Sequence, residues 1–369
     1  MHIEKLSLIN FKNYEQAALN FSEKINCLLG LNGSGKTNIL DALHYLSMTK
    51  SAHNTIDNQN IRFSEQFFSI KGSIRHEDKL MEVVCFYKEG AKKSFKLNKK
   101  DYGKLSEHIG KIPSVLVTPY DTDIIREGSE ARRRFFDSIL SQIDQEYLSA
   151  LIKYNLNLIQ RIIALNKFSI RDKVDYELLE TYYQLLIKFG DQIYLKRKAF
   201  IRDYLQDFYS TYQAIGTKRE DVNIEYISQL NSGDMKESLT RYIKKDLITE
   251  RTNYGVHKDD FKFLINASPI KKFGSQGQQK TFSIALKIAQ FQLIKSKIKV
   301  KPLLLLDDIF DKLDSKRIKK LLGLINENYF GQVFITDAGE ERAKKLLQEA
   351  HIKATYFQVK NGVIQQEGE

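Results

Sequence analysis

The stretch Gly30-Leu31-Asn32-Gly33-Ser34-Gly35-Lys36-Thr37-Asn38 decides the fold. Its first eight residues match G-x-x-x-x-G-K-[ST], a loop whose backbone N–H groups cradle phosphates. Residues 25–29 before it are mostly apolar and predict a strand, and apolar residues recur at helical spacing from Ile39 to Leu46. A plain glycine turn would not need this context. We therefore expect residues 30–38 to bind a nucleotide.

Two side chains of this loop have predicted chemical roles. Lys36 would reach the β- and γ-phosphates of ATP and assist catalysis, and the Thr37 hydroxyl would ligate Mg²⁺. The helix that begins here also turns its positive end toward the phosphates. The sequence thus predicts ATP and Mg²⁺ as cofactors.

Composition limits the other possibilities. The chain has 369 residues, of which 42% are hydrophobic and 28% charged, as in ordinary globular proteins with room for two or three domains. No run approaches the roughly 18 apolar residues of a membrane span, and the start lacks the pattern of a signal peptide. The two cysteines, Cys27 and Cys85, form no Cys-x-x-Cys pair, which argues against a zinc site or a disulfide framework. We expect a cytoplasmic protein.

The charge balance is basic. The formal net charge is +12 and the sequence pI is near 9.3. Such an excess suits a polyanionic partner, either nucleic acid or an acidic membrane surface, although a merely basic surface would explain it equally well. The basic residues are spread along the chain, and no run resembles a basic tail.

The pattern along the chain predicts three parts. Residues 1–128 hold the phosphate loop and several alternating strands of an antiparallel β subdomain. Residues 129–218 show helical periodicity in two stretches, Glu130–Phe168 and Val174–Ile215, which predict an inserted antiparallel arm roughly 55 Å long at 1.5 Å per residue. Residues 219–369 return to strands and helices and end in a hairpin about Asn361-Gly362.

A second acidic motif lies in this last part. Leu303-Leu304-Leu305-Leu306 predicts a buried strand that ends in Asp307 and Asp308. The carboxyl ends of parallel strands face the ligand in such folds. We therefore expect Asp307 to hold Mg²⁺ beside Thr37, and Asp308 to orient or deprotonate the attacking water. The alternative is an aspartate pair that caps the next helix.

Ser275-Gln276-Gly277-Gln278 opens another predicted helix. A hydroxyl, a glycine and free N–H groups form an anion-binding end, although the segment alone would be read as a helix cap. Its position before the Leu-rich strand makes it the third member of an ordered set.

This order resembles the ATPase heads of the ATP-binding-cassette superfamily, and most closely the RecF family of bacterial recombinational-repair proteins. The resemblance covers nearly the whole chain and is carried by Leu8–Tyr14, Gly30–Asn38, Glu130–Asp137, His257–Asp260, Ser275–Lys280 and Leu303–Asp314. It implies an α/β fold: a P-loop cassette ATPase head with an antiparallel β subdomain and an inserted helical arm.

The resemblance also implies a mechanism. Family members form an ATP-dependent homodimer, in which Ser275, Gln276, Gly277 and Gln278 of one subunit would complete the site of the other. Asp314 would lie across that interface. Slow hydrolysis would dissolve the dimer, so that ATP acts as a switch. The dimer would bind gapped duplexes and single-strand/double-strand junctions, and with RecO and RecR would help load RecA.

Some positions depart from the family pattern or stay open. Thr336 stands where cassette ATPases usually carry a phosphate-sensing His, and Lys258 replaces the usual Arg of its loop. Arg132–Arg134 could bind phosphates or a partner, or form a solvated helix start. Lys12-Asn13-Tyr14 could lie near the adenine or form an ordinary turn, and Pro119-Tyr120-Asp121 has no assigned role.

Three other functions compete with this one. A transporter ATPase is disfavoured by the basic charge, the long arm and Thr336. A chromosome-bridging head of the SMC type would need far longer coiled coils. A defence ATPase with a linked nuclease would need an extra carboxylate-rich domain. The main alternative is therefore another SMC-like or transporter-type cassette ATPase that acts through a protein partner.

Overall fold

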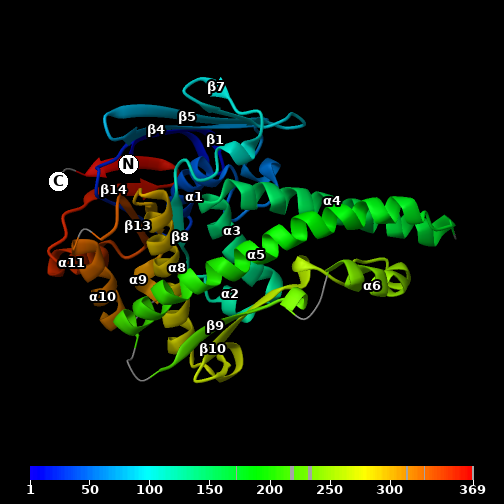
Figure 1. Cartoon of the computed structure of the whole chain (residues 1–369). Coiled ribbons are helices and arrows are strands. Elements are labelled where there is room, and N and C mark those ends of the chain that lie inside the picture. Colours follow the sequence, from blue (N-terminus) through cyan, green and yellow to red (C-terminus); the bar gives the residue numbers. More distant parts are fainter. Residues whose placement is uncertain (172, 217–219, 232–234, 313–314, 328, 368–369) are drawn as a thin grey trace. The chain divides into compact units, whose positions relative to one another are not determined.

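The computed structural model describes residues 1–171, 173–216, 220–231, 235–312, 315–327 and 329–367. The chain forms two compact units, each built from segments that are distant in sequence (Figure 1). The first contains Met1–Thr122, Thr211–Lys218 and Lys280–Glu369, and the second contains Asp123–Ser210 and Arg219–Gln279. The expected domain boundaries near residues 128 and 218 stay a prediction.

A six-stranded, mostly parallel sheet carries the phosphate loop in the first unit. Its strand order is β15-β14-β3-β13-β12-β8, and only the β14–β15 pair is antiparallel. The strands are β3 (Ile25–Leu29), β8 (Ser114–Val117), β12 (Leu303–Leu306), β13 (Val333–Asp337), β14 (Thr355–Lys360) and β15 (Val363–Glu367). Because β13 pairs in parallel with both β3 and β12, the carboxyl ends of those two strands lie at the same edge.

The second sheet of this unit is antiparallel, as expected for the β subdomain. Its order is β2-β1-β4-β5-β6-β7. The strands are β1 (His2–Phe11), β2 (Tyr14–Asn20), β4 (Phe67–His76), β5 (Lys79–Lys88), β6 (Ser94–Leu97) and β7 (Lys100–Asp101). The prediction of alternating antiparallel strands within residues 1–128 is therefore correct.

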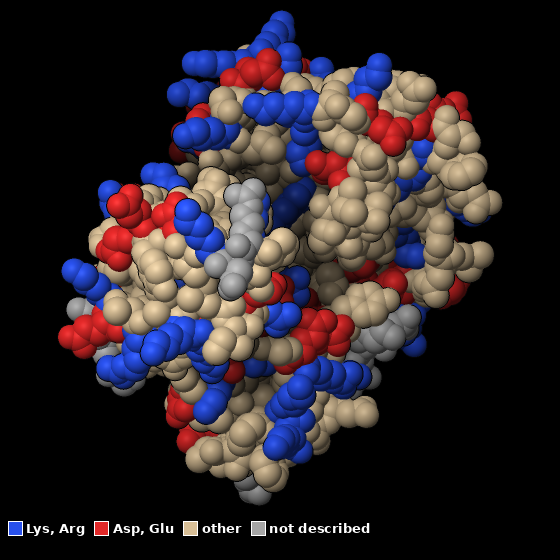
Figure 2. Space-filling model, turned by 90° about the vertical axis from the view of Figure 1, so that its right-hand side faces the viewer, with Lys and Arg blue, Asp and Glu red and all other residues tan. Residues whose placement is uncertain are grey.

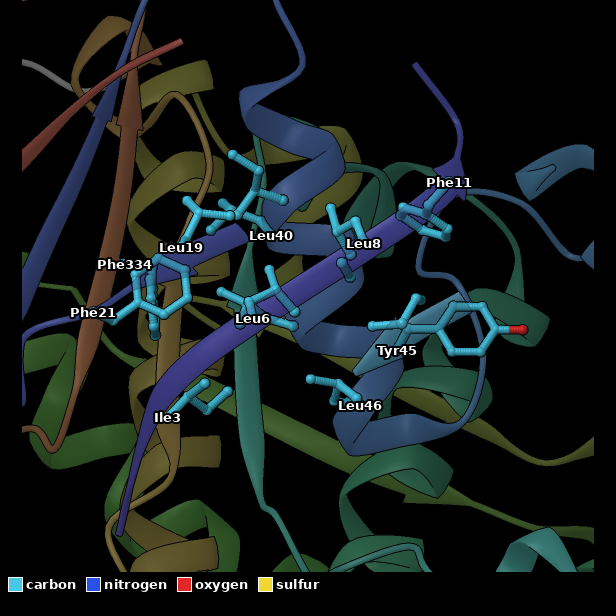
Figure 3. Close-up of a cluster of buried hydrophobic side chains, with 14 of the residues drawn as sticks. Ile3, Leu6, Leu8, Phe11, Leu19, Phe21, Leu40, Tyr45, Leu46 and Phe334 are labelled. Atoms are coloured by element: carbon cyan, nitrogen blue, oxygen red, sulfur yellow. The ribbon is translucent and has the colours of Figure 1, made fainter. Parts of the chain in front are cut away.

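The core of the first unit lies around α1 (Lys36–Met48), which contacts strands of both sheets. Leu6 and Leu8 of β1 lie near Leu40 of α1, and Phe334 of β13 packs edge to face with Phe21 (Figure 3). Burying each such side chain stabilises the fold by about 1.5–3 kcal/mol. This packing holds the start of α1, and with it the phosphate loop, against the sheet.

The remaining helices of this unit follow the strands of the parallel sheet. They are α9 (Ile309–Lys312), α10 (Ser315–Asn326) and α11 (Glu340–Glu349), while α8 (Gln276–Ile298) begins in the second unit and continues into the first. The hairpin expected at Asn361-Gly362 joins β14 to β15, with φ of 48° and 80° at its two turn residues. Positive φ at both positions is what a two-residue hairpin turn of this kind requires.

The second unit is a helical arm with a small sheet. Its helices are α2 (Asp123–Arg126), α3 (Ser129–Ile143), α4 (Gln145–Arg171), α5 (Tyr176–Ile215), α6 (Met235–Thr249) and α7 (Ile270–Phe273), of which α5 continues into the first unit from Thr211. Its strands are β9 (Val222–Ile227), β10 (Asp260–Ile265) and β11 (Ser268–Pro269), in the order β11-β10-β9. Among the described residues, no helix is long and apolar enough to cross a membrane.

One expectation for the arm is wrong. The stretch Glu130–Phe168 was expected to be one helix, but it is divided at Asp144, which has φ of −144° and ψ of 102°. The Asp144 carboxylate accepts a hydrogen bond from the backbone N of Tyr147 at 2.9 Å. Asp144 therefore ends α3 and caps α4, a role that Asp commonly takes.

Candidate nucleotide-binding site

The phosphate loop has the expected strand, loop and helix context. β3 is fully buried, and α1 begins at Lys36. Two glycines are required by close packing: a Cβ on Gly30 would lie 2.2 Å from the Val359 carbonyl oxygen, and one on Gly35 would lie 2.5 Å from Asn13 Nδ2. Gly35 also has φ of 116°, which side chains rarely allow. The loop is thus shaped by glycine.

Lys36 is held against this loop. Its ammonium donates hydrogen bonds to the carbonyl oxygens of Gly30 at 2.7 Å and Leu31 at 3.0 Å, and the residue is 4% exposed. The charge therefore lies against the loop itself, and its contact with phosphate oxygens stays a prediction.

The predicted metal ligands meet. Thr37 Oγ1 lies 2.9 and 3.1 Å from the two carboxylate oxygens of Asp307, although 270 residues separate them. A hydroxyl and a carboxylate are the oxygen ligands that Mg²⁺ prefers, so the pair fits this ion. The meeting follows from the topology, since β3 and β12 end at the same edge of the sheet.

Thr336, at the end of β13, is a site residue that the sequence analysis did not assign. Its hydroxyl donates to Asp307 Oδ1 at 2.7 Å and accepts a hydrogen bond from the backbone N of Asp308 at 2.9 Å. Thr336 therefore orients the carboxylate and fixes the turn that follows β12. A polar side chain at the end of a buried strand next to β12 was the available signal.

Asp308 lies in this turn with φ of 43°, in the left-handed region that Asp and Asn tolerate better than most residues. Asp308 is half-buried, and its neighbour Asp307 is buried. The next residue, Ile309, begins α9. The Asp pair therefore lies between the end of a strand and the start of a helix, as both interpretations of the pair require.

The turn at Asn13 braces the phosphate loop. Asn13 Nδ2 donates to the Ser34 carbonyl at 3.1 Å, and Asn13 Oδ1 accepts from Asn38 Nδ2 at 2.7 Å. The Tyr14 hydroxyl donates to the Gly35 carbonyl at 3.1 Å. The structure shows the turn, with contacts on both sides of the loop, and a place near the adenine stays a prediction.

Lys12 anchors the same turn to α1. Its ammonium lies 2.7 Å from a carboxylate oxygen of the buried Asp41. Burial alone would raise the pKa of Asp41, but the Lys12 charge and further hydrogen bonds outweigh it and lower that pKa. The carboxylate is therefore held in its charged form beside the loop.

The segment Ser275–Gln278 lies in the second unit and begins α8. Ser275 N donates to Gln278 Oε1 at 2.7 Å, and Gln278 N donates to Ser275 Oγ at 3.2 Å. This reciprocal pair is a capping box, so the helix-cap interpretation is correct for the local structure. Ser275 and Gln276 are nevertheless exposed, and Gly277 and Gln278 are half-buried.

Two of the segments that carry the family resemblance, Glu130–Asp137 and His257–Asp260, contact each other in the second unit. Arg132 forms a two-point ion pair with Asp260, at 2.8 and 3.0 Å, and Arg133 donates to the Asp259 carbonyl at 2.6 Å. Arg134 is exposed, with acidic partners no nearer than 3.7 Å. Arg132 and Arg133 therefore do not form a solvated helix start, because they join α3 to Asp259 and to the first residue of β10. Binding of phosphates or a partner by these arginines stays a prediction.

A buried arginine reinforces this junction. Arg197 of α5 lies 2.9 Å from the Asp137 carboxylate and 2.7 Å from that of Asp259. His257 in the same loop contacts the Tyr154 hydroxyl and the Thr252 carbonyl, both at 2.8 Å. Lys258 is exposed.

Asp121 has a structural role. Its carboxylate accepts from Thr118 N at 2.8 Å and lies 3.0 Å from the Lys287 ammonium. The prediction for Asp314 lies outside the described residues.

The fold and the site together define an ATP-binding-cassette ATPase head. The family described as "RecF/RecN/SMC N terminal domain" matches residues 2–365. An Smc head domain with an extended coiled coil from Pyrococcus furiosus is similar in fold, with a TM-score of 0.56, 18% identity, and 99% of this chain and 96% of that chain covered.

Relatives give the family more narrowly. The DNA replication and repair protein RecF of Flavobacterium johnsoniae is 45% identical over 95% of this chain and 98% of its own length. The RecF protein of Bacteroides thetaiotaomicron is 42% identical over 100% of this chain and 99% of its own length. A solved structure of "the recombination mediator protein RecF-ATP in RecFOR pathway" matches with a TM-score of 0.89 and 27% identity, covering 100% of this chain and 98% of that one. The chain belongs to the RecF family, and the predicted fold class is confirmed.

Proposed function

We propose that this protein is an ATP-dependent switch that binds DNA during recombinational repair and replication restart. The observation that carries the proposal is the contact of Thr37 Oγ1 with Asp307, which joins the phosphate loop to the acidic strand end. A solved structure of a similar protein contains ATP, as its description states, and this supports ATP as the ligand.

Each residue of the site has a proposed role. Residues 30–38 bind the phosphates through their N–H groups, and Lys36 contributes positive charge where the transition state gains negative charge. Thr37 and Asp307 hold Mg²⁺, which neutralises phosphate charge when bound. Asp308 orients or deprotonates the attacking water.

The signature segment would act on a second subunit. Ser275 and Gln276 are exposed at the start of α8, and N–H groups at a helix start attract phosphate. We propose that they complete the nucleotide site of a partner copy, so that ATP joins two subunits and slow hydrolysis releases them.

DNA is the proposed partner because of the charge. The net charge is +12, and in Figure 2 Lys and Arg side chains are spread over the visible face among acidic and neutral ones. We propose gapped duplexes and single-strand/double-strand junctions as ligands, with RecO and RecR as further partners. The similar solved structure is described as part of the RecFOR pathway. DNA affinity should fall steeply with salt, because bound phosphates release counterions.

Complementation between two defective variants tests the shared site. Asp308→Asn removes the water-activating carboxylate, and Ser275→Arg blocks the signature, so each alone should hydrolyse ATP very slowly. A mixture should recover up to roughly one quarter of the normal rate, because half the dimers are mixed and each has one intact site. No recovery in a mixture that forms mixed dimers would contradict a site shared between subunits.

The main alternative is a cassette ATPase of the SMC or transporter type that acts only through a protein partner. It predicts hydrolysis that a gapped duplex neither stimulates nor inhibits. Measuring ATP hydrolysis with and without this DNA separates the two.

A further inference from the structure

The arm helix α4 carries an exposed apolar stripe that the proposed switch does not use. Its members are 47–85% exposed and are Ile152, Leu156, Ile159, Ile163 and Ile170. Their spacings of four, three, four and seven residues place them on one face of the helix. Exposed branched side chains aligned in this way are unusual on a soluble surface.

The fold of the arm does not need this stripe. The opposite face of α4 supplies the buried contacts, through residues such as Tyr154, Arg161 and Leu165. Arg161 is fully buried and bonds Asp246 at 2.8 Å and the Tyr183 hydroxyl at 2.9 Å. α4 therefore has apolar side chains on two faces. One face packs inside the arm, and the other is the exposed stripe.

The spacing of the stripe is that of a coiled-coil seam. With Ile152 and Ile159 at d positions and Leu156 and Ile163 at a positions, the e positions are Lys153, Gln160 and Lys167. Residues 147–171 contain no Asp or Glu. Because e and g residues select the partner helix by charge, this seam favours a helix with acidic flanks.

A cavity continues the seam toward the tip of the arm. It has a volume of about 780 Å³, lies between α4 and the start of α5, and is lined in part by Ile163, Ala164, Phe168, Tyr176, Leu178 and Tyr182. Asp175, Glu177, Lys167 and Lys173 also line it, so its charges are mixed. A large apolar side chain at the end of a docked helix would fit this space.

We propose that the seam docks an amphipathic helix of another protein, with apolar residues at heptad spacing and acidic residues beside them. A second copy of this chain is a poorer occupant, because antiparallel self-pairing sets e beside e and brings Lys153 near Lys167 of the other copy. Parallel self-pairing sets these lysines beside the g positions, which are uncharged, and so gains no charge attraction. The inference does not depend on the proposed ATP switch.

Labelled synthetic helices test the proposal on the full-length protein. One peptide has four heptads with Leu at a and d and Glu at e and g. A second has Lys in place of Glu, and a third has the acidic composition in scrambled order. Fluorescence anisotropy should detect binding of the acidic amphipathic peptide and little binding of the other two.

Variants locate the binding surface. Leu156→Gln and Ile159→Gln should each weaken binding of the acidic peptide by at least about tenfold, since seam positions dominate such interfaces. Leu195→Gln is the matched control, because Leu195 is 62% exposed on α5 and lies outside the seam. The double variant Gln160→Glu, Lys167→Glu should shift the preference toward the basic peptide.

Three results would overturn the proposal: no binding of the acidic peptide, equal binding of the scrambled peptide, or equal weakening by Leu195→Gln. Sedimentation velocity supplies a fourth. If the wild-type protein self-associates and Ile159→Gln abolishes that association, the seam joins two copies of this chain instead. Circular dichroism of each variant should match the wild type, since the altered side chains are exposed.

Discussion

The Thr336 hydroxyl lies 2.7 Å from Asp307 Oδ1, and it binds the backbone N of Asp308 at 2.9 Å. One side chain thus holds both acidic residues at the end of β12. Cassette ATPases usually carry a phosphate-sensing His at this position in the chain. Here the residue faces the carboxylate that we propose as a Mg²⁺ ligand, and its predicted role is to position Asp307.

Replacing Thr336 by Val should weaken Mg²⁺ use while leaving the fold intact, because Val keeps the shape but cannot donate to Asp307. Losing such a supporting hydrogen bond commonly costs tenfold or more in metal affinity. We expect the Mg²⁺ concentration for half-maximal hydrolysis to rise by roughly tenfold. Thr336→Ser keeps the hydroxyl and should stay near the wild type. Equal Mg²⁺ dependence in Val and Ser variants would rule out this role.

Substitutions at Asp308 should separate its backbone role from its chemical one. Asp308 has φ of 43°, which Asn tolerates and Ala adopts at greater cost. Asp308→Asn should therefore keep its stability and its ATP affinity while losing hydrolysis. Asp308→Ala should lose hydrolysis and also about 1 kcal/mol of unfolding free energy. Urea unfolding measures the stability of each variant, and nucleotide titration measures its ATP affinity. If Asp308→Asn hydrolysed ATP at the full rate, Asp308 would have no part in the reaction.

The arginines of α3 should differ in their effect on stability. Arg132 pairs with Asp260 through two hydrogen bonds and its side chain is 13% exposed, so Arg132→Ala should lower the unfolding free energy by about 2 kcal/mol. The Arg134 side chain is 66% exposed, so Arg134→Ala should change the unfolding free energy by less than about 0.5 kcal/mol. Urea unfolding of the two variants compares them directly, and equal losses would contradict the assignment.

Acid should destabilise the first unit through His108. Burial lowers the pKa of His108 to about 4 from its usual 6.5. The unfolded chain therefore binds a proton near pH 6.5 that the folded protein accepts only near pH 4. The stability contributed by keeping His108 neutral is fully present above pH 6.5. It is lost as the pH falls toward 4, by up to about 3 kcal/mol.

Unfolding by urea at about pH 7.5 and about pH 5 checks this linkage. His108→Gln should be less stable at both values but should lose less on acidification than the wild type. His53→Gln is the control, because His53 is exposed. If His108→Gln and the wild type lose equal stability on acidification, His108 is not the group responsible.

The sequence was informative where chemistry is local. The phosphate loop between a strand and a helix, the strand that ends at Asp307 and the hairpin at Asn361-Gly362 each follow from adjacent residues. The same logic could have found the break before α4, since Asp144 stands just ahead of a helical pattern as a cap would. The helix α6 lies in a stretch to which we assigned no element, and six of its fifteen residues, Met235–Thr249, carry charge.

The long-range contacts differ in how far the sequence predicted them. Thr37 and Asp307 are 270 residues apart, and their meeting was expected because parallel strands present their carboxyl ends at one edge of the sheet. Arg132 and Asp260 are 128 residues apart, and their ion pair was not predicted, because it depends on the packing of the arm, which a local pattern does not specify. Thr336 is intermediate, because its position was singled out in the sequence but its hydrogen bond to Asp307 was not predicted.

The most direct test of the central claim is sedimentation velocity of the Asp308→Asn variant with Mg²⁺ and either ATP or ADP, with and without a gapped duplex. We predict a monomer in ADP and a dimer in ATP, and we expect only the dimer to bind the DNA. A monomer that ignores DNA in every condition would contradict the ATP-dependent switch.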